Sequence, residues 1–153
     1  MPMKKPALLA GLVFGATLLV AAGGGDAAGD TLVPARQAAF RLSGATFGSM
    51  KAAIDRGDDL KTLVFPAKSL AAWAHNLPAM FPPGSDGAGS KALPTVWSDR
   101  PGFIKAAANY AEAADKLAAL VAAGDKPGVA AQWTATRVTC KTCHDSYHTP
   151  MAN

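Results

Sequence analysis

The chain has 153 residues, 50% of them hydrophobic, and its 15 basic and 11 acidic residues give a formal net charge of +4. Without Lys4 and Lys5, which lie in a segment expected to be removed, 13 basic residues face 11 acidic ones. This small excess argues against nucleic acid or an anionic membrane surface as a partner. The composition is alanine-rich, with few β-branched runs and no alternating strand pattern, which predicts an all-α fold.

Residues 1–28 have the layout of a secretory signal peptide. A basic start at Lys4 and Lys5 precedes an apolar run from Pro6 to Ala22, and small residues follow. Cleavage is expected between residues 22 and 28, and the exact bond stays open. A retained membrane anchor would need about 20 apolar residues, which is longer than this run. We therefore expect that the segment is removed and that the mature chain does not insert stably into a membrane. Residues 29–153 then form one domain of ordinary size.

The first helix is expected at residues 34–56, because Pro34 suits a helix start and Gly57 suits a stop. One stripe along it contains Phe40, Gly44, Phe47, Lys51 and Ile54. Glycine inside a helix costs up to about 1 kcal/mol relative to alanine. Close approach of a partner helix or of a flat cofactor would justify Gly44.

The second helix is expected at residues 59–76, with an Asp58-Asp59 cap. Pro66 either kinks this helix or begins it as the first helical residue, and we favour the kink. Residues 77–96 are rich in proline and glycine and predict a loop. A loop of this length is often functional or packed, and Leu77, Phe81 and Leu93 are its apolar anchors.

The third helix is expected to begin near residues 96–101 and to run to Ala123, with Gly124 as the stop. Its predicted inner face comprises Ile104, Ala107, Ala108, Ala111, Leu117, Ala118 and Val121. The fourth helix begins with Asp125 as cap and Pro127 in its first turn. Four helices with short or medium connections predict an antiparallel four-helix bundle.

Cys140-Lys141-Thr142-Cys143-His144 is a C-x-x-C-H run, the attachment signature of a c-type haem. On a helix, Cys140, Cys143 and His144 share one face, and this face also carries Val129, Trp133, Thr136 and Tyr147. We therefore predict one covalent haem c per chain, with both thiols attached to the haem and His144 bound to the iron. Export agrees with this, because bacteria attach c-type haem outside the cytoplasm, and the predicted location is the periplasm of a Gram-negative bacterium.

Two other interpretations of the motif are weaker. A thioredoxin-like pair would want a βαβ context, which the sequence lacks. A zinc ion held by Cys140, Cys143, His144 and His148 would need ligands spread over about 12 Å of helix, too far to converge tetrahedrally.

Further stretches carry a resemblance to a known family. They are Arg36-Gln37 followed by Phe40, Leu77-Pro78 to Phe81-Pro82, Trp97-Ser98-Asp99, Gly124-Asp125 and the motif at 140–147. Together they resemble cytochrome c′, the class II c-type cytochromes, over residues 31–148. Proteins of this family carry the haem motif near the C-terminus of a four-helix bundle.

The resemblance implies roles for three residues of the first helix. Arg36 and Gln37 match residues that hold the haem propionates, with a solvated surface charge as the alternative for Arg36. Phe40 matches the residue over the open face of the iron, where low-spin relatives carry methionine. Phenylalanine has no donor atom, and Met50 lies about 15 Å further along the helix. We therefore expect five-coordinate, high-spin iron.

Such iron would bind NO or CO once Phe40 moves, and would exchange electrons at the haem edge with a periplasmic redox partner. The face under Phe40 is expected to lack a hydrogen-bond donor for bound O₂. The alternative is a low-spin, six-coordinate electron carrier. An enzyme is not expected, because the sequence shows no acid–base residue for that face.

His148 departs from the family, which usually carries arginine or lysine four residues after the haem histidine. It lies one turn from His144 and titrates near neutral pH, so we expect pH-dependent electrostatics beside His144. A frayed C-terminal residue is the alternative. The family also implies a homodimer packed through the first two helices, for which Met50, Leu63 and Leu70 are candidate exposed residues.

Overall fold

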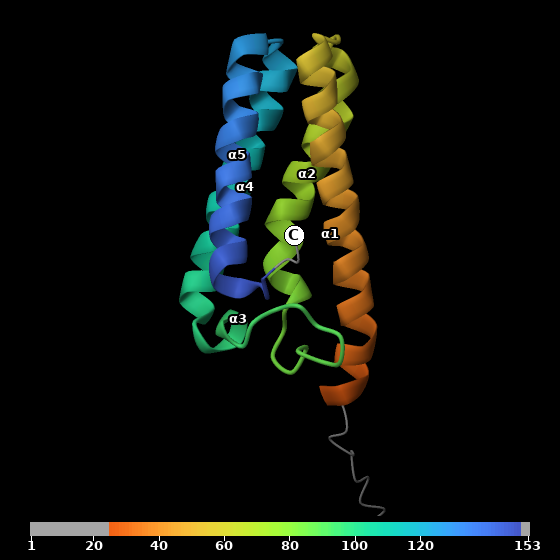
Figure 1. Cartoon of the computed structure of the whole chain (residues 1–153), viewed down its shortest axis with the longest axis vertical. Coiled ribbons are helices and arrows are strands. Elements are labelled where there is room, and N and C mark those ends of the chain that lie inside the picture. The colour runs from red at the N-terminus through yellow and green to blue at the C-terminus, as the bar shows by residue number, and fades with distance from the viewer. Residues whose placement is uncertain (1–24, 151–153) are drawn as a thin grey trace, which may run out of the picture.

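The computed structural model describes the backbone of residues 25–150 and the side chains from residue 31 onward. Four long helices, α1 (Gly25–Arg56), α2 (Val64–Asn76), α4 (Arg100–Ala123) and α5 (Lys126–Tyr147), form an antiparallel bundle (Figure 1). Two 3₁₀ turns, η1 (Leu60–Leu63) and η2 (Leu77–Met80), and a short helix, α3 (Thr95–Ser98), lie in the connections. The predicted all-α, four-helix architecture is confirmed. The predicted signal peptide falls almost entirely outside the described residues.

Local capping explains where α4 and α5 begin and where α4 ends. Asp99 accepts a hydrogen bond from the backbone N–H of Gly102 at 3.2 Å, and Asp125 accepts one from that of Gly128 at 3.0 Å. Between the two helices Gly124 has φ of 75°, the left-handed conformation that glycine adopts without strain. The predicted stop and start at residues 124 and 125 therefore hold.

Two predicted boundaries were wrong. α1 begins at Gly25, and Pro34 lies inside it with an exposed side chain, so water can bind the carbonyl whose partner this proline removes. Residues 59–76 form no kinked helix. Instead η1 is capped by Asp59, and α2 begins at Val64 with Pro66 in its first turn, where the missing N–H costs no hydrogen bond.

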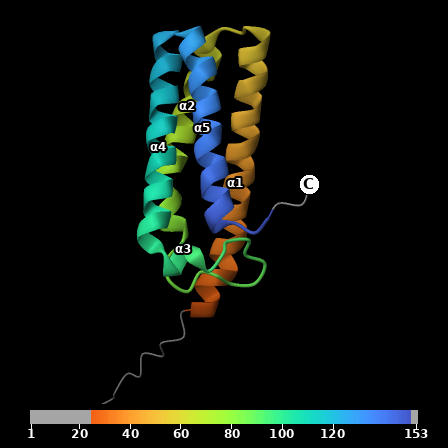
Figure 2. The same ribbon diagram turned by 60° about the vertical axis from the view of Figure 1, so that its left-hand side comes forward.

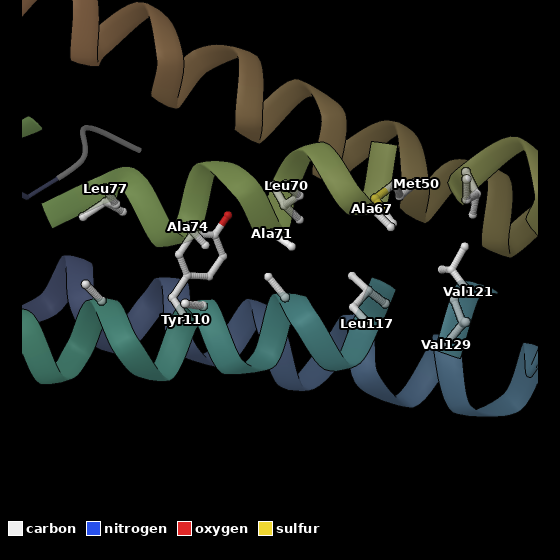
Figure 3. Packing of buried hydrophobic residues seen from close by; sticks show 14 of the residues in the cluster. Met50, Ala67, Leu70, Ala71, Ala74, Leu77, Tyr110, Leu117, Val121 and Val129 are labelled. Atoms are coloured by element: carbon white, nitrogen blue, oxygen red, sulfur yellow. The ribbon is translucent and has the colours of Figure 1, made fainter. Parts of the chain in front are cut away.

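The core lies between α2 and α4, as Figure 3 shows for Leu70, Ala71, Ala74, Tyr110 and Leu117. Alanines on both helices allow their backbones to approach closely. Ile104 and Ala108, predicted on the inner face of α4, are exposed. The predicted Ala107, Ala111, Leu117 and Val121 are buried. The buried stripe also includes Phe103, Tyr110 and Ala114, and most of it has heptad spacing.

The residues predicted to form a dimer contact are buried. Met50 is 0% exposed, Leu63 5% and Leu70 3%, because the bundle core takes all three. The large exposed hydrophobic residues of the first two helices are Leu42 at 70% and Phe65 at 80%. Gly44 is also exposed, and apart from the adjacent backbone of α1 no atom of the described residues lies within 4 Å of the position that a Cβ would take. Close approach of a neighbouring helix therefore does not explain this glycine.

α1 contacts its neighbours less extensively than α4 does. At the end far from α3, Phe47 stacks on Trp133 of α5 with ring centroids 4.4 Å apart. At the other end, α1 passes the loop at residues 81–94, here called the 81–94 loop (Figure 2). In the described part of the chain, no helix is long and apolar enough to span a membrane.

Candidate haem site

A cavity of about 650 Å³ lies in the half of the bundle next to the 81–94 loop. Its volume is in the range of cofactor sites, about 300–1,000 Å³. All four long helices contribute to its wall. The wall includes every residue that the sequence singled out for the site, namely Arg36, Gln37, Phe40, Cys140, Cys143, His144 and His148.

The α5 side of the cavity carries the haem-attachment motif on one helix face. Both thiols are free and half-buried. Burial raises the pKa of the Cys143 thiol to about 11 and also raises that of Cys140. Within the described residues no group of three or more His, Cys, Asp or Glu side chains is arranged to hold a metal ion.

His144 is suited to bind a metal as a neutral imidazole. Burial lowers its pKa, and the neighbouring His148 lowers it further. The two imidazole rings lie one turn apart, with centroids separated by 5.1 Å. Because a histidine must be neutral to ligate a metal, burial favours the form of His144 that ligation needs.

His148 is held in place by the 81–94 loop, so the alternative of a frayed residue does not hold. Its backbone forms an antiparallel bridge with Ala92. On either side, Leu93 N donates to Tyr147 O at 3.0 Å and Thr149 N donates to Lys91 O at 2.8 Å. The loop thereby joins the end of α5.

Arg36 attaches the same loop to α1. Arg36 is 3% exposed, and its guanidinium donates to Ser90 Oγ at 2.7 Å, to Ser85 Oγ at 3.1 Å and to Met80 O at 3.4 Å. It also stacks over the ring of Phe81, 4.5 Å from the centroid. Next to it, Gln37 Nε2 donates to Gly89 O at 2.9 Å. The alternative of a solvated surface charge for Arg36 is wrong.

The charge of Arg36 has no close partner. All its hydrogen-bond acceptors are neutral, and no carboxylate of the described residues forms an ion pair with it. Burial lowers its pKa, and only the more distant Asp86 opposes this. A buried cation is costly without a counter-charge. The cavity wall therefore presents a site for an anion.

The remaining charges of the wall have the same sign. Arg41 and Lys91 also line the cavity, and among the described residues no aspartate or glutamate does. Both side chains are exposed, which places them at the mouth. Sequence reasoning missed these two residues, since nothing in their spacing connects α1 to the 81–94 loop.

Aromatic side chains form the wall opposite the motif. Phe40 of α1 meets Trp73 of α2 edge to face, with centroids 5.2 Å apart, and lies 6.3 Å from Phe81. Phe103 and Tyr110 of α4 complete the apolar lining. Sequence reasoning also missed Trp73, Phe103 and Tyr110, although the heptad spacing on α4 could have revealed the last two.

These features fit a haem. The cavity has apolar aromatic walls for a flat ring, two free thiols and an imidazole on one face, and basic residues without carboxylate partners for its two propionates. A haem would be held by Cys140, Cys143 and His144 on α5 and by basic residues of α1 and the 81–94 loop.

Comparison with known proteins points the same way. The family described as Cytochrome C′ matches residues 31–148. Cytochrome c′ of Rubrivivax gelatinosus is 39% identical over 116 residues, covering 73% of this chain and 89% of the relative. Cytochrome c-556 of Agrobacterium fabrum is 31% identical over 150 residues, 96% of this chain and 97% of the relative.

The fold is shared with solved structures as well. A nitric oxide complex of a variant of cytochrome c′ from Alcaligenes xylosoxidans superimposes with a TM-score of 0.74 at 27% sequence identity. The superposition covers 80% of this chain and 97% of that structure.

Proposed function

We propose that this chain, which belongs to the cytochrome c′ family, carries one covalent haem c with five-coordinate, high-spin iron and binds nitric oxide or carbon monoxide. Haem c supplies an iron that binds small diatomic ligands and changes its charge by one electron. The chain supplies attachment, one axial ligand and control of access.

Attachment and charge compensation come from opposite sides of the cavity. Cys140 and Cys143 supply the two thioether bonds, and His144 supplies the imidazole, kept neutral by its burial. Arg36 supplies the counter-charge for a propionate, while its guanidinium keeps its hydrogen bonds to Ser85 and Ser90 of the 81–94 loop. Arg41 and Lys91 at the mouth compensate the second propionate.

The distribution of donor atoms around the cavity carries the five-coordinate proposal. The sulfur and imidazole donors of the wall, Cys140, Cys143, His144 and His148, all belong to α5 or follow it directly. The described parts of α1, α2 and α4 contribute no methionine or histidine to the wall. Met50 is fully buried in the bundle core, and burial raises the pKa of Tyr110, which disfavours a phenolate ligand.

Phe40 then determines access to the side opposite His144. Its ring is held between Trp73 and Phe81, so an entering ligand must displace a packed aromatic side chain. Such a face favours small uncharged ligands. The nitric oxide complexes known for the Alcaligenes xylosoxidans relative support this choice of ligand.

The setting of the protein follows from the same proposal. We expect it in the periplasm, exchanging electrons with a redox partner at the cavity mouth, where Arg41 and Lys91 lie. A homodimer would use the outer face of α1 and α2, where Leu42 and Phe65 are exposed. We expect no enzymatic turnover, because among the described residues no carboxylate lines the cavity and the two lining histidines lie on the α5 side.

Absorption and electron paramagnetic resonance spectra of the purified holoprotein, with and without nitric oxide, test the proposal. The expected ferric spectrum is high-spin, and the ferrous spectrum changes on addition of the gas. A ferrous spectrum that already shows a low-spin, methionine-ligated pattern would falsify the five-coordinate assignment and favour the electron carrier.

A further inference from the structure

Trp73 differs from the other tryptophans in the state of its indole N–H. The chain has three tryptophans. Trp97 Nε1 donates to Pro82 O at 2.9 Å, and Trp133 Nε1 donates to Phe47 O at 3.0 Å. Trp73 Nε1 is buried, yet no described residue accepts its hydrogen bond. Buried indole N–H groups usually have an acceptor, so this donor lacks its partner within the protein.

The position of Trp73 indicates where the acceptor belongs. Its side chain lines the cavity from α2, and α2 lies diagonally across the bundle from α5 (Figures 1 and 2). Because α5 carries Cys140, Cys143 and His144, Trp73 belongs to the wall opposite the haem-attachment face. Its ring contacts Phe40 edge to face at 5.2 Å, so the two residues form one aromatic unit over that side.

We propose that the Trp73 indole N–H donates a hydrogen bond to a small ligand bound in the cavity on the side opposite His144. This inference rests on the proposed function and adds a donor to a face that the sequence suggested to have none. While Phe40 covers this wall, the donor is shielded. Displacement of Phe40 by an entering ligand brings the ligand to the N–H.

The donor gives the site a preference among ligands. A hydrogen bond stabilises most the ligands that accumulate negative charge on their outer atom, such as bound O₂, and least those with little charge there, such as CO. Trp73 is therefore a specificity-determining residue. Its loss speeds dissociation of a charge-accumulating ligand by roughly two- to tenfold, the size expected for one net hydrogen bond.

The infrared C–O stretch of the ferrous carbon monoxide complex tests the proposal in the holoprotein. Trp73→Phe keeps an aromatic ring and removes the N–H. The expected result is a shift of the stretch to higher frequency, because the positive end of the donor no longer faces the ligand. Trp97→Phe and Trp133→Phe are matched controls whose N–H groups already have backbone acceptors, and neither shifts the band.

Tyr110 is the alternative donor, since it also lines the cavity and carries a hydroxyl. A band that shifts in Tyr110→Phe and stays in place in Trp73→Phe overturns the proposal and assigns the donor to Tyr110. The proposal is also overturned if Trp73→Phe leaves the C–O stretch unmoved but alters the midpoint potential, because the indole N–H then donates its hydrogen bond to a haem propionate.

A measurement on the unaltered protein covers the case in which Trp73→Phe does not fold. Exchange from H₂O to D₂O shifts the iron–ligand Raman bands if an exchangeable N–H contacts the ligand, and a band unaffected by D₂O contradicts the proposal. Failure of the unaltered protein to bind carbon monoxide is a different result, which contradicts the proposed function itself.

Discussion

Arg36 Nη2 lies 2.7 Å from Ser90 Oγ, a contact between residues 54 positions apart that joins α1 to the 81–94 loop. The other end of this loop pairs with the end of α5 through Ala92 and His148. One buried guanidinium therefore connects the helix that carries Phe40 to the loop that holds His148. The resemblance assigned Arg36 only to a propionate, whereas the structure adds this second role.

Replacing Arg36 with methionine should destabilise the protein strongly. The substitution keeps much of the apolar stem and removes three hydrogen bonds from a charged donor, each worth about 1.5–3 kcal/mol when made. Because the three share one group, we expect a net loss of about 2–4 kcal/mol in the free energy of unfolding, measured by urea denaturation of the holoprotein.

Arg56→Met is the control for this change. Arg56 forms an exposed ion pair with Asp58 at 2.6 Å, and exposed pairs contribute little to stability. Equal losses in the two variants would mean that the Arg36 contacts with the 81–94 loop do not matter for stability.

Replacing Phe40 with methionine should convert the iron to a six-coordinate, low-spin state. Phe40 reaches the cavity from α1, on the side where the described residues supply no sulfur or imidazole ligand for the iron. Methionine places a thioether there. The measurement is the ferric and ferrous absorption spectrum, with loss of rapid nitric oxide binding as the second readout.

Phe47→Met is the matched control. Phe47 lies two turns along α1, stacks on Trp133 and does not line the cavity. Its spectrum should stay high-spin. A Phe40→Met protein that remains high-spin would show that this position does not face the iron.

The local part of the fold could be predicted from the sequence, since Gly124 and Asp125 are short-range signals and the haem-attachment motif needs only helical spacing. The start of α1 could not be predicted from the sequence. Pro34 removes one backbone N–H, but the sequence does not show whether water can replace the lost hydrogen bond. The burial of three residues could not be predicted either, because it depends on how the helices rotate toward each other. These residues are Met50, Leu63 and Leu70.

The candidate site divides in the same way. Cys140, Cys143 and His144 belong to one helical turn and could be assigned from spacing. Trp73 lies on another helix, and its approach to Phe40 depends on the packing of α1 against α2. Interhelical contacts of this kind leave no periodic signal within either segment.

Gly102→Ala should destabilise the start of α4, although alanine is the better helix former. A Cβ at residue 102 would meet the Asp99 carboxylate and lie 2.5 Å from the Tyr147 hydroxyl. These two groups share a hydrogen bond of 2.8 Å, and Asp99 also caps the helix. Loss of a cap costs about 0.5–2 kcal/mol, so thermal unfolding should begin at a lower temperature.

Gly44→Ala is the opposite case at a position with free space. Apart from the adjacent backbone of α1, no described residue would contact the new Cβ, and the exchange favours a helix by up to about 1 kcal/mol. We expect a higher melting temperature. A destabilised Gly44→Ala protein would mean that a bound group or a second subunit closely approaches this face of α1.

The two tyrosines of the chain should both resist ionisation in the folded protein. Burial raises the pKa of Tyr110, and the hydrogen bond to Asp99 raises the pKa of Tyr147. The unfolded chain releases both phenolic protons near pH 10, while the folded chain keeps them. The unfolded state therefore binds fewer protons above pH 10, and stability should fall as the pH rises through this region.

Nuclear magnetic resonance of protein labelled with ¹³C at tyrosine Cζ, in the diamagnetic ferrous carbon monoxide form, can follow each ring separately. Both resonances should keep their phenol positions past pH 10, and in urea both should move near pH 10. Asp99→Asn should return the Tyr147 resonance toward ordinary titration and leave that of Tyr110 unchanged, because the two shifts have different causes. Parallel titration of both rings near pH 10 in the folded protein would contradict the burial of Tyr110 and the Tyr147–Asp99 bond together.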